Sequence, residues 1–239
     1  MKQYNEQQAQ RFVYLIEYMD KLIGRLMAKA EDLEIYENTY FIFCADNGTA
    51  NTAKDRGVER GVHVPYVVRG PGIKRLGATN QLTDFADVAP TLLEMAGIPI
   101  PKDVSFDGQS QLPFLTGKTK THREWIYAYT GSVQVLRTKH HLLEARSPLL
   151  GKPKGRFYFA GESRFGRGYK RAENDPAHAP ALSLLRRVVD DLPSHLEEDH
   201  PFWKSKYGKR WLQNNPDRSE LAKKQLYNHP DYSRYDESD

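Results

Sequence analysis

The segment Tyr-Phe-Ile-Phe-Cys-Ala-Asp-Asn-Gly at residues 40–48 joins a short apolar run to two oxygen-bearing side chains and a glycine. A continuous apolar run of this length is typical of a strand buried on both faces, as in parallel sheets covered by helices. In open α/β sheets, ligands bind just beyond the carboxyl ends of the strands. Asp46 and Asn47 would lie there, and their side-chain oxygens suit Ca²⁺ or Mg²⁺. The alternative is an Asp-Asn-Gly turn that closes a β-hairpin.

Further motifs surround this segment in a fixed order. A helix-like stretch at 16–26 precedes the segment at 40–48. The motifs that follow the segment are Lys54, Glu-Arg-Gly at 59–61, Val-Pro-Tyr-Val-Val-Arg-Gly-Pro-Gly at 64–72, Leu-Thr-Asp-Phe-Ala-Asp-Val-Ala-Pro-Thr at 82–91 and Phe-Asp-Gly-Gln-Ser at 106–110. This order resembles the sulfatases of the alkaline-phosphatase-like superfamily over roughly residues 10–140. The resemblance implies an α/β fold: part of an alkaline-phosphatase-like sheet covered by helices, plus a small carboxyl-terminal antiparallel subdomain.

The resemblance also implies roles for individual residues. Asp46 and Asn47 match two metal ligands of the family's active-site calcium, and Lys54 matches the catalytic lysine that contacts the sulfate of the ester. Cleavage of a sulfate ester places negative charge on the sulfuryl and leaving oxygens, which a divalent cation and a fixed ammonium stabilise. Without the motif, Lys54 would be interpreted as a solvated loop residue.

His63 and His140 are candidate substrate-binding residues. His63 stands where the family has an arginine, so an anion contact there would depend on pH near neutrality. His140 and His141 follow Lys139 on a predicted strand, where alternation places one side chain inward and the other outward. The alternative for each is a structural or surface histidine. Arg60 also replaces a family glycine, so the local turn is expected to accommodate a Cβ.

The chain lacks the family's nucleophile motif, Cys/Ser-x-Pro/Ala-x-Arg, whose first residue is oxidised to formylglycine, and also an early Asp-Asp pair. The sole cysteine, Cys44, lies in an apolar strand and is expected to be a small buried core residue. The chain therefore resembles the carboxyl-terminal half of a sulfatase. We expect residues 1–122 to be the carboxyl-terminal part of the catalytic α/β domain, and 123–239 to be a small subdomain with a surface-wrapping tail.

The element pattern is readable along the chain. Apolar spacing predicts a helix over residues 6–33 that covers the sheet, and a second strand at 64–68. Asp87 is the expected N-cap of a short helix that Gly97 closes. Strands are predicted at 125–129 and 133–144, and helices at 180–191 and 217–227.

Composition limits the class of protein and its partners. Hydrophobic residues make up 39% and charged residues 28%, and no apolar run approaches the ~18 residues of a membrane span. The net charge of +4 favours polyanions without selecting one. The aromatic and basic segment 155–171 fits either a loop that packs on the domain or a site for sulfated carbohydrate. Nucleic acid is not expected. The resemblance implies a periplasmic or secreted location.

Several functions remain open from these residues. The first is a sulfatase that cleaves sulfate esters, with sulfated carbohydrate as substrate and a separately encoded amino-terminal half as a conceivable partner. The second is phosphate or phosphonate ester hydrolysis within the same superfamily. The third is an inactive truncated remnant or a polyanion-binding module. Asp-Asn-Gly followed by lysine favours the sulfatase branch.

Overall fold

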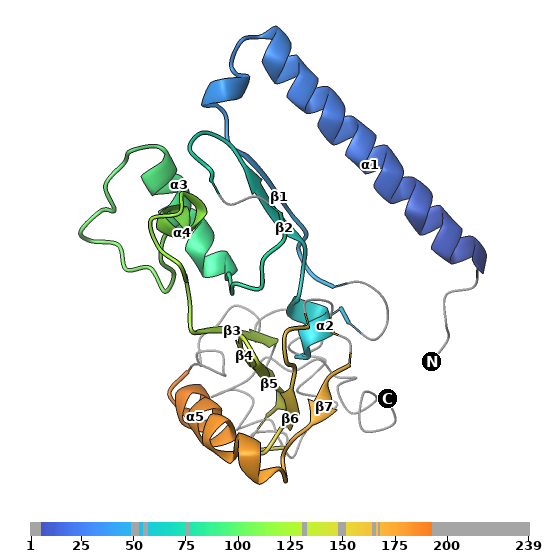
Figure 1. The fold of residues 1–239 in the computed structure, drawn as a ribbon, viewed down its shortest axis with the longest axis vertical. Helices are drawn as coiled ribbons and strands as arrows, with labels where there is room; N and C mark the ends of the chain where they lie inside the picture. The colour runs from blue at the N-terminus through green and yellow to red at the C-terminus, as the bar shows by residue number, and fades with distance from the viewer. Residues whose placement is uncertain are drawn as a thin grey trace, which may run out of the picture. The chain divides into compact units, whose positions relative to one another are not determined.

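The computed structural model describes residues 6–48, 53–54, 57–74, 77–130, 133–147, 152–163, 166 and 168–192 (Figure 1). These residues fall into two compact units. The first contains residues up to Cys44 together with Pro65–Ile73, and the second contains Ala45–Val64 and the chain from Lys74 onward. The predicted helix at 217–227 lies outside the described residues. The predicted domain boundary at residues 122 and 123 stays a prediction.

The first unit is a long helix and a two-stranded sheet. Its elements are α1 (Glu6–Asp32), the short 3₁₀ helix η1 (Tyr36–Asn38), β1 (Phe41–Cys44) and β2 (Tyr66–Arg69). β1 pairs with β2 in antiparallel register, with Phe41 opposite Arg69 and Cys44 opposite Tyr66. The helix predicted over residues 6–33 is thus confirmed to within one residue.

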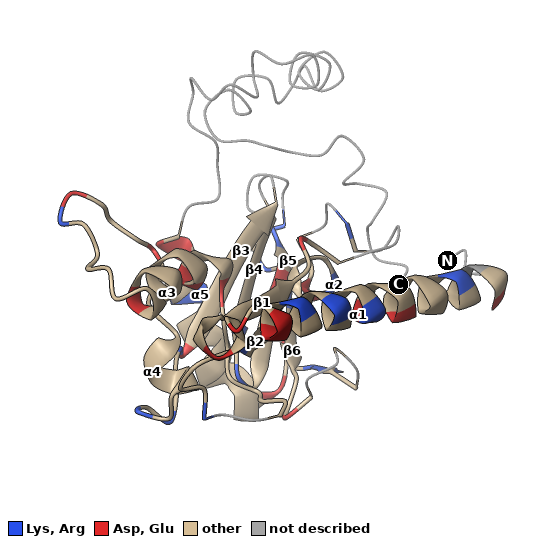
Figure 2. Cartoon of the chain, turned by 90° about the horizontal axis from the view of Figure 1, so that it is seen from above, with Lys and Arg blue, Asp and Glu red and all other residues tan. Residues whose placement is uncertain are grey.

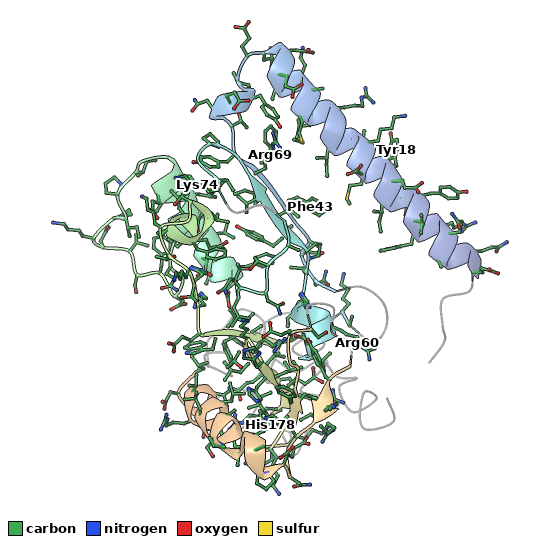
Figure 3. The ribbon with its side chains drawn as sticks, viewed as in Figure 1. Tyr18, Phe43, Arg60, Arg69, Lys74 and His178 are labelled. Atoms are coloured by element: carbon green, nitrogen blue, oxygen red, sulfur yellow. The ribbon has the colours of Figure 1, made fainter. Side chains whose placement is uncertain are left out.

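Three expectations for this unit are corrected. β1 is only partly buried and has an antiparallel neighbour, so its apolar run does not mark a strand buried between two helical layers. Cys44 is exposed, because it ends the strand, and is therefore not a core residue. α1 leaves its apolar stripe open to solvent, with Leu15 66% and Leu26 63% exposed, so this stripe does not cover the sheet within the described residues. Tyr18 points outward from the same helix in Figure 3.

The second unit is built around a five-stranded antiparallel sheet. Its strands are β3 (Trp125–Thr130), β4 (Val133–Thr138), β5 (His141–Arg146), β6 (Arg156–Phe159) and β7 (Lys170–Arg171), and they pair in sequence order. The strands predicted at 125–129 and 133–144 are confirmed, and the second one divides into β4 and β5. This is the small carboxyl-terminal antiparallel subdomain that the sequence indicated.

Side chains alternate across this sheet and divide its two faces. Leu136, Leu143 and Phe157 point to one face and form the core with residues of α5 (Ala179–Asp190), which follows the short 3₁₀ helix η4 (Pro176–His178). α5 lies alongside the strands in Figure 1. Successive residues of a strand point to opposite faces, so the neighbours of these core residues belong to the other face. We call that other face the loop face, because the segment around Glu59 is bonded to it.

Four short elements complete the second unit. They are α2 (Glu59–Val62), η2 (Phe85–Asp87), α3 (Val88–Met95) and α4 (Leu112–Leu115). Gly97 follows α3 with a φ of 67°, the left-handed conformation that favours glycine after a helix, as predicted. Asp87 precedes α3, but its side chain makes no cap for that helix. None of the helices in the described part of the chain is long and apolar enough to cross a bilayer.

Candidate functional site

Asp46 and Asn47 lie in a bend that follows β1 by one residue. The Asn47 backbone amide donates to Asp46 Oδ1 at 2.9 Å, and the Asp46 carboxylate is otherwise open to solvent. Hydrogen bonds from Asn47 hold the pKa of Asp46 below its ordinary value, and the charge of Lys54 lowers this pKa further. The bend therefore presents an ionised carboxylate with an ammonium group nearby, which brings together three of the predicted site residues.

Gly48 fixes this bend against α2. Its amide donates to the carbonyl of Gly61 at 2.9 Å. A Cβ on Gly48 would lie 1.7 Å from the carbonyl oxygen of Arg60, so only glycine fits without a backbone shift. β1 reaches its partner strand through the long connection of residues 45–65. The alternative of a tight Asn-Gly hairpin is therefore wrong.

The residues that depart from the family pattern take ordinary conformations. Arg60 is exposed within α2, where a Cβ meets no obstacle because the backbone is helical. Figure 3 labels Arg60 on this helix. His63 directly follows α2, its side chain is exposed, and its amide donates to the Glu59 carbonyl at 2.7 Å. Its place at the end of the helix that holds Gly48 is compatible with a substrate contact, which stays a prediction.

His141 is the first residue of β5, whereas His140 lies in the turn between β4 and β5, so the prediction that both lie on one strand and alternate across it is wrong. His140 Nδ1 lies 3.2 Å from the Gly161 carbonyl and 3.4 Å from Glu162 Oε1. His141 Nε2 lies 3.1 Å from His178 Nδ1, and its ring stacks on Phe157. The contacts of His140 thus attach it to the turn after β6, and a substrate-binding role for it stays a prediction.

The side-chain oxygens of the bend provide some of the ligands that a hard cation needs. Asp46 and Asn47 offer a carboxylate and an amide oxygen, whereas Ca²⁺ takes about six to eight oxygen ligands. Among the described residues, no group of three or more His, Cys, Asp or Glu side chains is arranged to hold a metal ion. The pair therefore suits a cation whose remaining ligands come from elsewhere.

The structure also contains a buried ionic cluster at the beginning of α2, which the sequence did not predict. Arg137 Nε donates to Glu59 Oε1 at 2.8 Å, and the two side chains are only 11% and 12% exposed. The Glu59 amide donates to Glu144 Oε2 at 2.8 Å, and Glu144 pairs with Arg156 at 3.1 Å. Burial raises the pKa of Glu144, and the Glu59 amide and the charge of Arg156 oppose that shift. Glu59 belongs to the 59–61 motif and Arg137 to the predicted strand at 133–144, but nothing in the sequence pairs the two residues.

Asp87 forms a second buried cluster. Its side chain is inaccessible to solvent, and it accepts from Arg123 Nε at 2.8 Å and lies 2.9 Å from His122 Nε2. It also accepts from the amides of Asp84 and Gln109. Burial opposes ionisation, but these bonds together hold the pKa of Asp87 well below its ordinary value. Asp87 therefore ties η2 to the segment before β3, in place of the predicted N-cap role.

Comparisons with known proteins agree with this architecture. The family model described as "Sulfatase" matches residues 1–98, and the model described as "N-sulphoglucosamine sulphohydrolase, C-terminal" matches residues 54–143. An ulvan-active sulfatase of Formosa agariphila is 37% identical over 46% of this chain and 22% of its own length. Human arylsulfatase A is 34% identical over 46% of this chain and 24% of its own length.

A solved structure shares the fold over nearly the whole chain. The structure of a 2-O GAG sulfatase superposes with a TM-score of 0.61 at 18% identity, covering 95% of this chain and 48% of the other. The predicted α/β fold of the alkaline-phosphatase-like type is thereby confirmed. The chain spans less than a quarter of the length of these curated relatives and about half of the solved structure. On these matches, residues 1–143 of the chain are similar to sulfatases, and the model that matches residues 54–143 describes a carboxyl-terminal part.

Proposed function

We propose that this chain supplies the metal- and sulfate-binding bend of a sulfatase that hydrolyses sulfate esters. The observation that carries the proposal is that Asp46 and Asn47 lie on one bend, which Gly48 fixes to α2, with the charge of Lys54 close enough to lower the pKa of Asp46. The similarity to sulfatases supports the reaction class, and the residues supply the charges that this reaction needs.

Each residue has a distinct task in this proposal. Asp46 and Asn47 would hold Ca²⁺, which when bound neutralises negative charge on the sulfuryl oxygens. Lys54 is exposed on the same segment, and its ammonium would bind the sulfate group and stabilise charge in the transition state. His63 and His140 would contact the remainder of the substrate. The nucleophile, a formylglycine in this proposal, lies outside this sequence.

Sulfated carbohydrate is the proposed substrate class. Ulvan-active and GAG sulfatases stand among the similar proteins. A periplasmic or secreted location is part of the proposal, since extracellular sulfatases are also among the relatives. A separately encoded amino-terminal half is the partner in this proposal.

An inactive module that binds polyanions is the second candidate. It is favoured by one observation: the described residues supply two neighbouring oxygen ligands and no third grouped acid or histidine. Such a module would bind sulfated polysaccharide without cleaving it.

The two candidates separate in one experiment. The protein is purified from its natural source with whatever chains accompany it, and hydrolysis of 4-nitrophenyl sulfate is measured with and without a calcium chelator. Expressed in the same background, Asp46→Ala and Lys54→Ala should each abolish most hydrolysis, and the exposed control Lys102→Ala should not. Full activity in both variants would sink the site assignment. Binding of a sulfated polysaccharide with no hydrolysis would favour the inactive module.

A further inference from the structure

The Glu59–Arg137 pair occupies an unusual place for two charges. It lies on the loop face of the sheet, and both partners are almost fully buried. Moving charges out of water is costly, so a buried pair is weak evidence for stability. Its geometry is the better guide to its role.

The pair joins parts of the chain that are far apart in sequence. Glu59 is the first residue of α2, and Arg137 lies in β4, 78 residues away. The Glu59 amide reaches Glu144 of β5, 85 residues away. Two adjacent strands of the sheet therefore hold the beginning of α2. β4 binds the side chain of Glu59 through Arg137, and β5 binds its backbone amide through Glu144.

The neighbouring residue Gly57 adds a third attachment. Its carbonyl accepts from the amide of Ala145 at 2.9 Å. A Cβ on Gly57 would lie 2.4 Å from Cγ1 of Val133, so the backbone here is too close to β4 for any residue with a Cβ to fit without a shift. The segment that enters α2 is thus fixed to both β4 and β5.

The arginine is itself held rigidly. Its guanidinium donates to the carbonyls of Thr138 at 2.7 Å and His141 at 3.2 Å, and it lies 5.4 Å from the centre of the Tyr169 ring. A planar guanidinium with five donors can make these contacts together, whereas a lysine ammonium cannot reproduce them. Arg137 therefore fixes where the Glu59 carboxylate lies.

The attachment continues from α2 to the candidate site. Gly61, two residues after Glu59, accepts the hydrogen bond from Gly48, which directly follows Asp46 and Asn47. We propose that Glu59 and Arg137 are positioning residues that transmit the geometry of the antiparallel sheet to the Asp46–Asn47 bend. The proposal rests on the proposed function, because the bend matters only if it binds metal and sulfate.

The test compares local and global stability in Arg137→Lys and Glu59→Gln. Amide hydrogen exchange of Gly48 and Gly61 should accelerate about tenfold or more in each variant. The amides of the β3–β4 pair and the urea midpoint should stay close to the wild type. In the source preparation, kcat for 4-nitrophenyl sulfate should fall in parallel, with a smaller change in KM. Glu59→Gln keeps the shape of the side chain and carries the test if Arg137→Lys fails to fold.

Arg171→Lys is the matched control. Arg171 also pairs with a glutamate, Glu173, and lies 5.3 Å from the centre of a tyrosine ring, but it is exposed at β7. It should leave the exchange of Gly48 unchanged. Unchanged Gly48 exchange in both test variants overturns the positioning role, whatever the activity. Faster exchange in a protein without sulfatase activity supports the positioning role and counts against the proposed function.

Discussion

The amide of Gly48 donates a hydrogen bond to the carbonyl of Gly61 at 2.9 Å, and this contact joins the Asp46–Asn47 bend to α2. The two glycines belong to separate sequence motifs, Asp-Asn-Gly and Glu-Arg-Gly. Their contact explains why the motifs occur together: one carries the candidate ligands, and the other provides the surface on which those ligands are held.

Gly48→Ala should therefore disturb the bend. The new Cβ would start 1.7 Å from the Arg60 carbonyl oxygen, and crowding of this kind typically costs about 1–3 kcal/mol. Urea unfolding measures the loss. Gly24→Ala is the control, because nothing lies within 4 Å of its Cβ in the middle of α1, where alanine should stabilise by about 1 kcal/mol. Equal effects of the two substitutions would contradict the close approach at Gly48.

Asp46→Ala and Lys54→Ala should affect different properties, the first the calcium affinity and the second the kcat. Removing Asp46 takes away a proposed metal ligand, so calcium affinity should fall by about 10- to 100-fold or more, measured by calcium dependence of hydrolysis. Asp103→Ala, which removes another exposed carboxylate, should leave that dependence unchanged.

Lys54→Ala should spare the calcium dependence and lower kcat for aryl sulfates by about 10²–10³-fold, as when one transition-state donor is removed. Lys54→Arg tests whether a planar cation can replace the compact ammonium. A calcium dependence that shifts as strongly in Lys54→Ala as in Asp46→Ala would argue against separate roles.

Arg123→Met should destabilise the second unit strongly. It would leave the solvent-inaccessible Asp87 carboxylate with one fewer partner, and breaking a buried pair typically costs 3–5 kcal/mol. Lys29→Met is the control, because the Lys29–Asp32 pair is 3.9 Å long and exposed and should contribute less than about 1 kcal/mol. Both are measured by urea unfolding, and similar losses would refute the structural role of Asp87.

Stability should also decline in mild acid because of His141. Burial lowers the pKa of His141, and the nearby charges of His178, His140 and Arg137 lower it further. The folded state therefore binds fewer protons than the unfolded state just below the ordinary value of 6.5, so stability falls as pH decreases through that range. His178, labelled in Figure 3, shares the hydrogen bond with His141. His141→Phe keeps the stacking on Phe157 and should flatten the dependence between about pH 7.5 and 5.5. An unchanged slope would contradict this assignment.

The helices, the strands and the candidate ligands after β1 could be predicted from the sequence, because they depend on local patterns. Alternation in residues 133–144 gave the strands, and the oxygen-bearing side chains after β1 indicated the ligands. The Glu59–Arg137 pair was not predictable, because no local pattern relates two residues that are 78 positions apart. Asp87 occupies the predicted N-cap position of α3, but its carboxylate bonds to η2 and Arg123 instead of capping α3, and the local pattern does not reveal this difference.

The surroundings of α1 could not be predicted from the sequence either. Its apolar spacing predicts a helix with one buried side, but spacing does not say which surface covers that side. Basic and acidic residues both occur along this helix in Figure 2. The exposure of Cys44 was missed for a similar reason, because an apolar run does not reveal which of its ends leaves the sheet.

The sequential strand order of the antiparallel sheet has a consequence for how the protein assembles. Each strand from β3 to β7 pairs with its neighbour in the chain, and such local pairings close short loops and form quickly. The contacts from Glu59 close loops of 78 and 85 residues, so they are expected to form after the sheet exists. The bend that carries Asp46 would then be among the last parts to reach its native geometry, and a slow-folding variant would acquire its secondary structure before it could bind a metal ion.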